Sequence, residues 1–144
     1  MSINNSPLRS EQENEQHGQK GENESVDMEK LERLRSSMSK LGAQAFAELI
    51  HSYLGEAEYR VAQMQQALSQ SNLADLQLAA HTLRSSSALV GATHLSQLCQ
   101  ELETSIRTES ELERGQSPNV YQMLSQIVAE YNGVKSRLET ELAE

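Results

Sequence analysis

Apolar residues recur at alternating intervals of four and three residues along most of the chain that follows residue 26. This spacing places the apolar side chains on one face of an α-helix, whereas a β-strand would need strict alternation. One such stripe lies in a predicted helix over residues 44–69. Its members are Phe46, Ile50, Tyr53, Ala57, Val61, Met64 and Leu68. The pattern therefore predicts a helical chain.

The residues between the stripes carry the signals that start and stop helices. A short helix is predicted from Asp27, as its N-cap, to about Ser36, and Gly42 interrupts the pattern after it. The third helix is predicted to begin at Asn72, which has Asp75 three residues later as in a capping box, and to end at Gly91.

Two further helices complete the predicted fold. Thr93 is the predicted N-cap of the fourth helix, and a polar loop over residues 110–117 follows that helix. Ser117 and Pro118 are the expected N-cap and first residue of the last helix. Four long amphipathic helices with short connections predict an all-α fold, an antiparallel up-down four-helix bundle with a short extra N-terminal helix.

Residues 1–25 differ from the rest of the chain. The stretch is rich in Asn, Gln, Glu, Ser and Gly, and Ile3 and Leu8 are its only large apolar residues after Met1. Such a segment buries too little apolar surface to offset the entropy lost on ordering. We therefore predict a disordered tail over residues 1–25 and a single helical domain over residues 26–144.

Charge and composition limit the partners of the chain. Its 12 basic and 21 acidic residues give a formal charge of −9, which disfavours binding to nucleic acids or to an anionic membrane. There is no apolar run long enough to span a bilayer and no secretory signal, so a cytoplasmic location and a monomeric state are expected. The single cysteine, Cys99, excludes a disulfide framework and is expected to be a buried apolar residue.

The motifs of autonomous catalysis are missing from the sequence. It contains no glycine-rich phosphate-binding loop, no HExxH metal motif and no GxSxG nucleophile elbow. We therefore expect no ATP-dependent kinase activity, no metal and no cofactor on this chain. Any chemistry must use one side chain and a partner that supplies the other groups.

His81 is the side chain that the predicted third helix singles out. On a helical wheel it lies roughly 130° from the centre of the apolar stripe, so it should point to solvent. Most of its neighbours on the wheel are small or apolar, which is unusual for a solvated face and favours the approach of another protein. These neighbours, the candidate partner-binding residues, are Ala74, Gln77, Leu78, Ser85, Ala88 and Leu89. Arg84, one turn from His81, is a candidate to hold an anion attached to the imidazole.

The sequence around His81 resembles the core motif of histidine-containing phosphotransfer (HPt) domains. From Ala80 to Glu103 it reads AHTLRSSSALVGATHLSQLCQELE, and the usual wording of that family is AHxLKGSSxxLGAxxLxxLCxxLE. The similarity extends from about Ala45 to Leu138. Two departures from the pattern lie beside His81, where Arg84 replaces a lysine and Ser85 replaces a glycine.

The resemblance implies a phosphocarrier of a multistep phosphorelay. His81 would accept a phosphoryl group from an aspartate of a receiver domain and pass it to the receiver of a response regulator, with a hybrid sensor histidine kinase upstream. The receiver would supply Mg²⁺, and Arg84 would be the charge partner of the phosphoryl group. The alternative is a non-phosphorylated adaptor that binds receiver domains or other signalling proteins through the same helix face. Ser85 would favour this alternative if its side chain hindered transfer.

Overall fold

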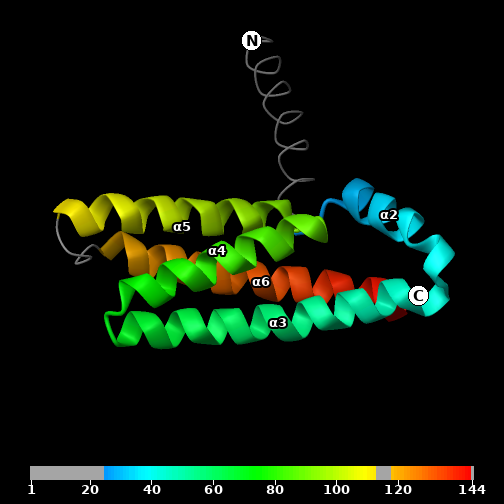
Figure 1. The fold of residues 1–144 in the computed structure, drawn as a ribbon, viewed down its shortest axis with the longest axis horizontal. Helices are drawn as coiled ribbons and strands as arrows, with labels where there is room; N and C mark the ends of the chain where they lie inside the picture. The colour runs from blue at the N-terminus through cyan, green and yellow to red at the C-terminus, as the bar shows by residue number, and fades with distance from the viewer. Residues whose placement is uncertain (1–24, 113–117, 144) are drawn as a thin grey trace, which may run out of the picture.

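The structure is a computed structural model that describes residues 25–112 and 118–143. All regular secondary structure in these ranges is helical, which confirms the predicted all-α class for this part of the chain (Figure 1). The helices, with the 3₁₀-helix η2, are α2 (Met28–Ser37), η2 (Ser39–Leu41), α3 (Ala43–Ser69), α4 (Leu73–Leu89), α5 (Thr93–Leu112) and α6 (Pro118–Ala143).

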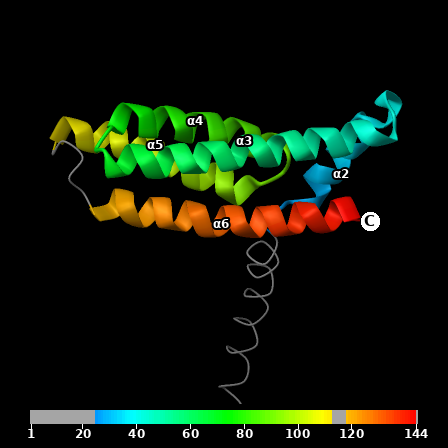
Figure 2. The ribbon, with the colours of Figure 1, turned by 90° about the horizontal axis from the view of Figure 1, so that it is seen from below.

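The four long helices lie side by side, and each runs in the direction opposite to the one before it (Figures 1 and 2). Helix α4 packs against α3 and α5, and α6 packs against the same two helices from the other side. In Figure 2, α4 and α6 therefore form opposite sides of the molecule, with α3 and α5 between them. Within the described ranges, the outer face of α4 is left free of other helices.

The predicted apolar stripes form the core between these helices. All seven stripe residues of α3 are buried, from Phe46 to Leu68. The same spacing continues over residues 73–90, 95–106 and 120–142. The stripe residues there are buried except for Leu73, Leu98 and Leu142, which are partly buried against the core. Burial of this apolar area is the main force that holds the helices together.

The helix starts follow the capping signals in two cases. The Asp27 carboxylate accepts hydrogen bonds from the backbone N–H groups of Glu29 and Lys30, and the Asn72 side chain accepts one from Asp75. Both interactions satisfy donors that have no partner within the first turn of a helix.

Two predicted boundaries are wrong. Thr93 is the first residue of α5 rather than its N-cap, because Ala92 already accepts the first helical hydrogen bond, from Ser96 N–H. Helix α5 also continues to Leu112 and takes in the first three residues of the predicted loop over 110–117. Glu and Leu favour helices, so the sequence allows α5 to run beyond Ser110.

Helix α2 docks on the turn between α4 and α5. Asp27 N–H donates to the Gly91 carbonyl oxygen at 2.7 Å, and Leu31 is fully buried beside it. At the other end of α2, Arg35 forms a 3.3 Å ion pair with Glu141 of α6. The predicted short helix is therefore a packed part of the bundle.

None of the helices in the described ranges is long and apolar enough to cross a membrane. The predicted disordered tail lies outside the described residues, except for Ser25.

Candidate functional site

His81 lies in the middle of α4, on the face that points away from the core. Its side chain is 53% exposed, while its neighbours Ala80 and Leu83 are fully buried. The exposure predicted from the helical wheel is thus confirmed. The helix presents an imidazole to solvent from a backbone that is fixed by the core.

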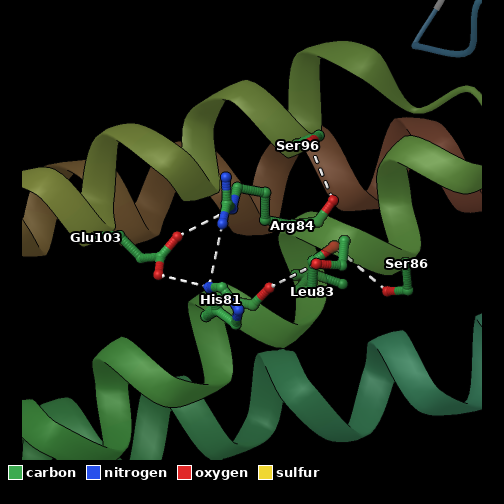
Figure 3. A network of polar contacts seen from close by, with 7 residues as sticks. His81, Leu83, Arg84, Ser86, Ser96 and Glu103 are labelled. Carbon is green, nitrogen blue, oxygen red and sulfur yellow. Dashed lines mark hydrogen bonds and ion pairs between the residues drawn. The ribbon is translucent and has the colours of Figure 1, made fainter.

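Glu103, from α5, is the nearest charged partner of His81. Its residue exposure is only 8%, and its Oε2 lies 2.9 Å from His81 Nδ1 (Figure 3). Glu103 is not among the site residues predicted from the sequence. A signal was present, because Glu103 is one helical turn after the buried Cys99 and next to the buried Leu102, on the inner side of α5. A carboxylate in that position needs a hydrogen-bonding or charged partner.

Arg84 joins His81 and Glu103 in one network. Its Nη2 lies 3.1 Å from His81 Nδ1, and its Nε lies 3.1 Å from Glu103 Oε1 (Figure 3). The second contact is an ion pair, although the Nε–H bond does not point at the oxygen. Arg84 is therefore engaged with the carboxylate that also contacts the histidine, and its side chain is one-third exposed.

The donor and acceptor chemistry of this network assigns the tautomer of His81. A carboxylate can only accept a hydrogen bond and a guanidinium can only donate one, so Nδ1 cannot bond to both at once. We assign the proton to Nδ1, because a lone pair there would face the Glu103 oxygen at 2.9 Å. Nε2 then carries the lone pair of the neutral ring, which makes it the nucleophilic nitrogen.

The predicted partner-binding residues surround His81 on the outer face of α4. Ala74, Ser85 and Ala88 are exposed, and Gln77 is half-buried. Leu78 and Leu89 are 58% and 55% exposed, which makes them two of the most exposed large apolar residues of the described chain. We call these six residues together with His81 and Arg84 the His81 face.

The His81 face lacks acidic side chains in a chain that is strongly acidic. The one acidic residue of α4 is Asp75 in the first turn, where its side chain accepts a hydrogen bond from that of Asn72. Glu103 reaches the face only with a nearly buried carboxylate that Arg84 balances. The face can therefore approach an acidic surface without strong repulsion.

Ser85, the residue that departs from the family pattern, lies one turn beyond His81. Its hydroxyl donates a long hydrogen bond of 3.5 Å to the His81 carbonyl oxygen. The side chain is exposed, so any group that approaches the imidazole from this side meets the Ser85 hydroxymethyl.

The network of His81, Arg84 and Glu103 does not include His94 or Cys99. His94 of α5 is 51% exposed, and its Nδ1 lies 3.4 Å from Glu130 Oε1 of α6. Cys99 is fully buried as predicted, and burial raises the pKa of its thiol to about 12. In the described ranges, no three His, Cys, Asp or Glu side chains gather as a metal site would require.

Comparisons with known proteins agree with this geometry. A family model described as the Hpt domain matches residues 48–137. The chain is also similar to the crystal structure of histidine-containing phosphotransfer protein B (HptB) from Pseudomonas aeruginosa PAO1, with a TM-score of 0.69 and 25% sequence identity. That similarity covers 81% of this chain and 92% of the other. A comparison with curated protein sequences gave no match.

Proposed function

The chain belongs to the Hpt domain family, whose members carry phosphoryl groups on histidine in phosphorelays, and on this premise we propose that His81 is the phosphoryl carrier. The observation that carries the proposal is the contact between His81 Nδ1 and the nearly buried Glu103 carboxylate at 2.9 Å. This contact leaves the lone pair on Nε2 of a half-exposed ring.

The proposed reaction is a phosphoryl transfer between two proteins. Nε2 of His81 attacks the phosphorus of an aspartyl phosphate on a receiver domain, so that an N–P bond forms and the P–O bond to the aspartate breaks. The ring then carries a positive charge that it shares with Nδ1–H, which the Glu103 carboxylate stabilises. In the second step an aspartate of another receiver attacks the phosphorus, and His81 leaves as the neutral ring.

Arg84 is proposed to act on the phosphoryl group from one helical turn away. Its guanidinium is one-third exposed and already contacts the ring nitrogen, so a rotation of the side chain would bring it to the phosphoryl oxygens. Glu103 would then keep its hydrogen bond to Nδ1–H while Arg84 changes partner. Glu103 thus balances the positive charge of the ring, and Arg84 balances the negative charge of the phosphoryl group.

The His81 face is the proposed docking surface for receivers. Leu78 and Leu89 provide apolar contact on either side of the histidine, and small residues lie between them. The absence of exposed acidic groups from α4 near His81 suits a receiver, whose phosphorylation pocket is acidic and is expected to bring the Mg²⁺. In this proposal the chain itself supplies a nucleophile and one cation, without ATP-dependent kinase activity.

The domain that carries His81 and the proteins that it would meet are also part of the proposal. We propose that residues 26–144 form one up-down four-helix domain of Hpt type, preceded by a tail. The partners would be a hybrid sensor histidine kinase and a response regulator. The chain would bind them as a monomer in the cytoplasm. The order in which the four long helices pack supports the proposed domain, and membership of the family supports the proposed partners.

The test is phosphoryl transfer from a purified receiver that carries an aspartyl phosphate. The wild-type chain should acquire acid-labile phosphate, whereas His81→Gln should remain folded and acquire none, because an exposed side chain contributes little to packing. His94→Gln is the matched control, since His94 is equally exposed and also lies beside a carboxylate. Arg84→Ala should accept phosphate more slowly.

Two results would contradict the proposal. Phosphate that remains on His81→Gln would place the acceptor elsewhere. A wild-type chain that binds receivers through the His81 face but acquires no phosphate from any of them would favour the adaptor function.

A further inference from the structure

Two residues of α5, Ser96 and Glu103, contact Arg84, and they lie two helical turns apart. The Ser96 hydroxyl donates to the backbone carbonyl oxygen of Arg84 at 2.9 Å, and Glu103 contacts the side chains of Arg84 and His81 (Figure 3). Residues seven apart lie on the same face of a helix, so both contacts come from the side of α5 that meets α4.

The Ser96 hydrogen bond joins two helices and is additional to the backbone hydrogen bonds within each of them. The Arg84 carbonyl is inside α4, where the helix already offers it a backbone donor four residues later, and a carbonyl oxygen can accept two hydrogen bonds. The hydroxyl therefore adds a directional link at the α4–α5 seam. Such a link fixes the position of one helix along the other more narrowly than non-directional apolar contact does.

We propose that Ser96 is a positioning residue that keeps α4 in register with α5, so that the Glu103 carboxylate meets His81 Nδ1. The proposal rests on the function proposed above. The contact between Nδ1 and Oε2 is 2.9 Å, near the preferred length of a hydrogen bond, and a slide of α4 along the seam would both lengthen and bend this bond, which weakens it. Without the Ser96 hydrogen bond, Glu103 would no longer hold the ring proton on Nδ1, and both neutral tautomers of His81 would be populated.

The first experiment reads the tautomer of His81 without any phosphoryl transfer. The ¹⁵N shifts of the ring, measured at a pH where the ring is neutral, should show mainly Nδ1–H in the wild-type chain. Ser96→Ala should give a mixture of both tautomers. Ser96→Thr, which keeps the hydroxyl, should restore the wild-type signal, and Ser105→Ala is the control for loss of another α5 hydroxyl. Thermal unfolding checks that each variant is folded.

The second experiment is single-turnover transfer from a phosphorylated receiver. Ser96→Ala should be slower by up to about tenfold, because a residue that acts through Glu103 cannot cost more than the loss of that orienting partner itself. If Ser96 acts through Glu103, the same substitution should cause no further loss in a Glu103→Gln chain.

Two outcomes would overturn the proposal. One is an unchanged His81 tautomer in folded Ser96→Ala, and the other is an equal loss of rate in the wild-type and Glu103→Gln backgrounds. If the wild-type chain accepts no phosphate, the proposed function fails, and the tautomer measurement still decides the role of Ser96.

Discussion

At the scale of single residues, the chemistry of His81 depends on which of its two ring nitrogens carries the proton. The wheel position of His81 predicts that the ring is exposed, but it says nothing about the tautomer. The tautomer follows from Glu103, a residue 22 positions away that only the packing of α5 on α4 brings within 2.9 Å. The exposure of the His81 ring could therefore be predicted from the sequence, whereas its contact with Glu103 could not.

Substitution of Glu103 by Gln tests this dependence. The glutamine amide can donate to Nδ1 as well as accept from it, so the proton of the ring can move to Nε2 and block the nucleophile. We expect the transfer rate to fall by about tenfold, at the lower end of the losses seen when an orienting partner of a histidine is removed. The measurement is single-turnover transfer, with the folded state checked by circular dichroism. An unchanged rate would show that Glu103 has no part in the reaction.

Ser85→Gly tests the departure from the family pattern. The exposed Ser85 side chain lies one turn from His81, where an incoming aspartyl phosphate must approach, so its removal should raise the transfer rate. Glycine should lower the free energy of unfolding by roughly 0.5 kcal/mol, because serine lies between alanine and glycine in helix propensity. A slower transfer in this variant would mean that the hydroxyl helps, for instance by donating to the phosphoryl group.

At the scale of helices, the sequence predicts most of the fold because apolar spacing and capping residues act locally. The stripe of α3 and the caps at Asp27 and Asn72 are found where the pattern places them. The start of α5 is displaced by one residue, since the turn at Gly91 already brings Ala92 into the first helical hydrogen bond. The way in which α2 packs could not be predicted, because it depends on contacts between distant segments such as Arg35 and Glu141.

Gly91 is the residue on which the docking of α2 depends. Its φ of +86° is a conformation that other residues rarely adopt, and a Cβ there would lie 2.9 Å from the Asp27 carbonyl oxygen. Gly91→Ala should therefore lower the free energy of unfolding by at least about 1–2 kcal/mol, the cost of a left-handed alanine, with the crowding in addition. Urea unfolding measures the change.

Gly55→Ala is the matched control for that substitution. Gly55 is exposed inside α3, and a Cβ on it would meet no atom within 4 Å. Alanine should stabilise the chain there by about 0.5–1 kcal/mol, since glycine loses more backbone entropy in a helix. Equal effects of the two substitutions would contradict the special role assigned to the turn at Gly91.

At the scale of the whole molecule, the His81 face differs in charge from the chain as a whole. The formal charge is −9, yet the His81 face presents neutral side chains and one arginine. This contrast favours one orientation in an encounter, because an acidic partner is repelled from most of the surface and least from the His81 face.

The last prediction concerns residues 1–24, which hold two basic and five acidic residues and no apolar stripe. Deletion of these residues should leave the melting temperature and the transfer rate nearly unchanged, because the segment offers little apolar surface to bury. The cut must stop before Ser25, since the Ser25 side chain lies against Gly133 and Val26 is fully buried. A second chain that also lacks residues 25–27 is the contrasting variant. It loses the burial of Val26, the Asp27 cap and the hydrogen bond to Gly91, and should melt at a clearly lower temperature. If the shorter deletion already lowers the melting temperature, the first 24 residues contribute to the stability of the helical domain, and the boundary proposed for that domain is wrong.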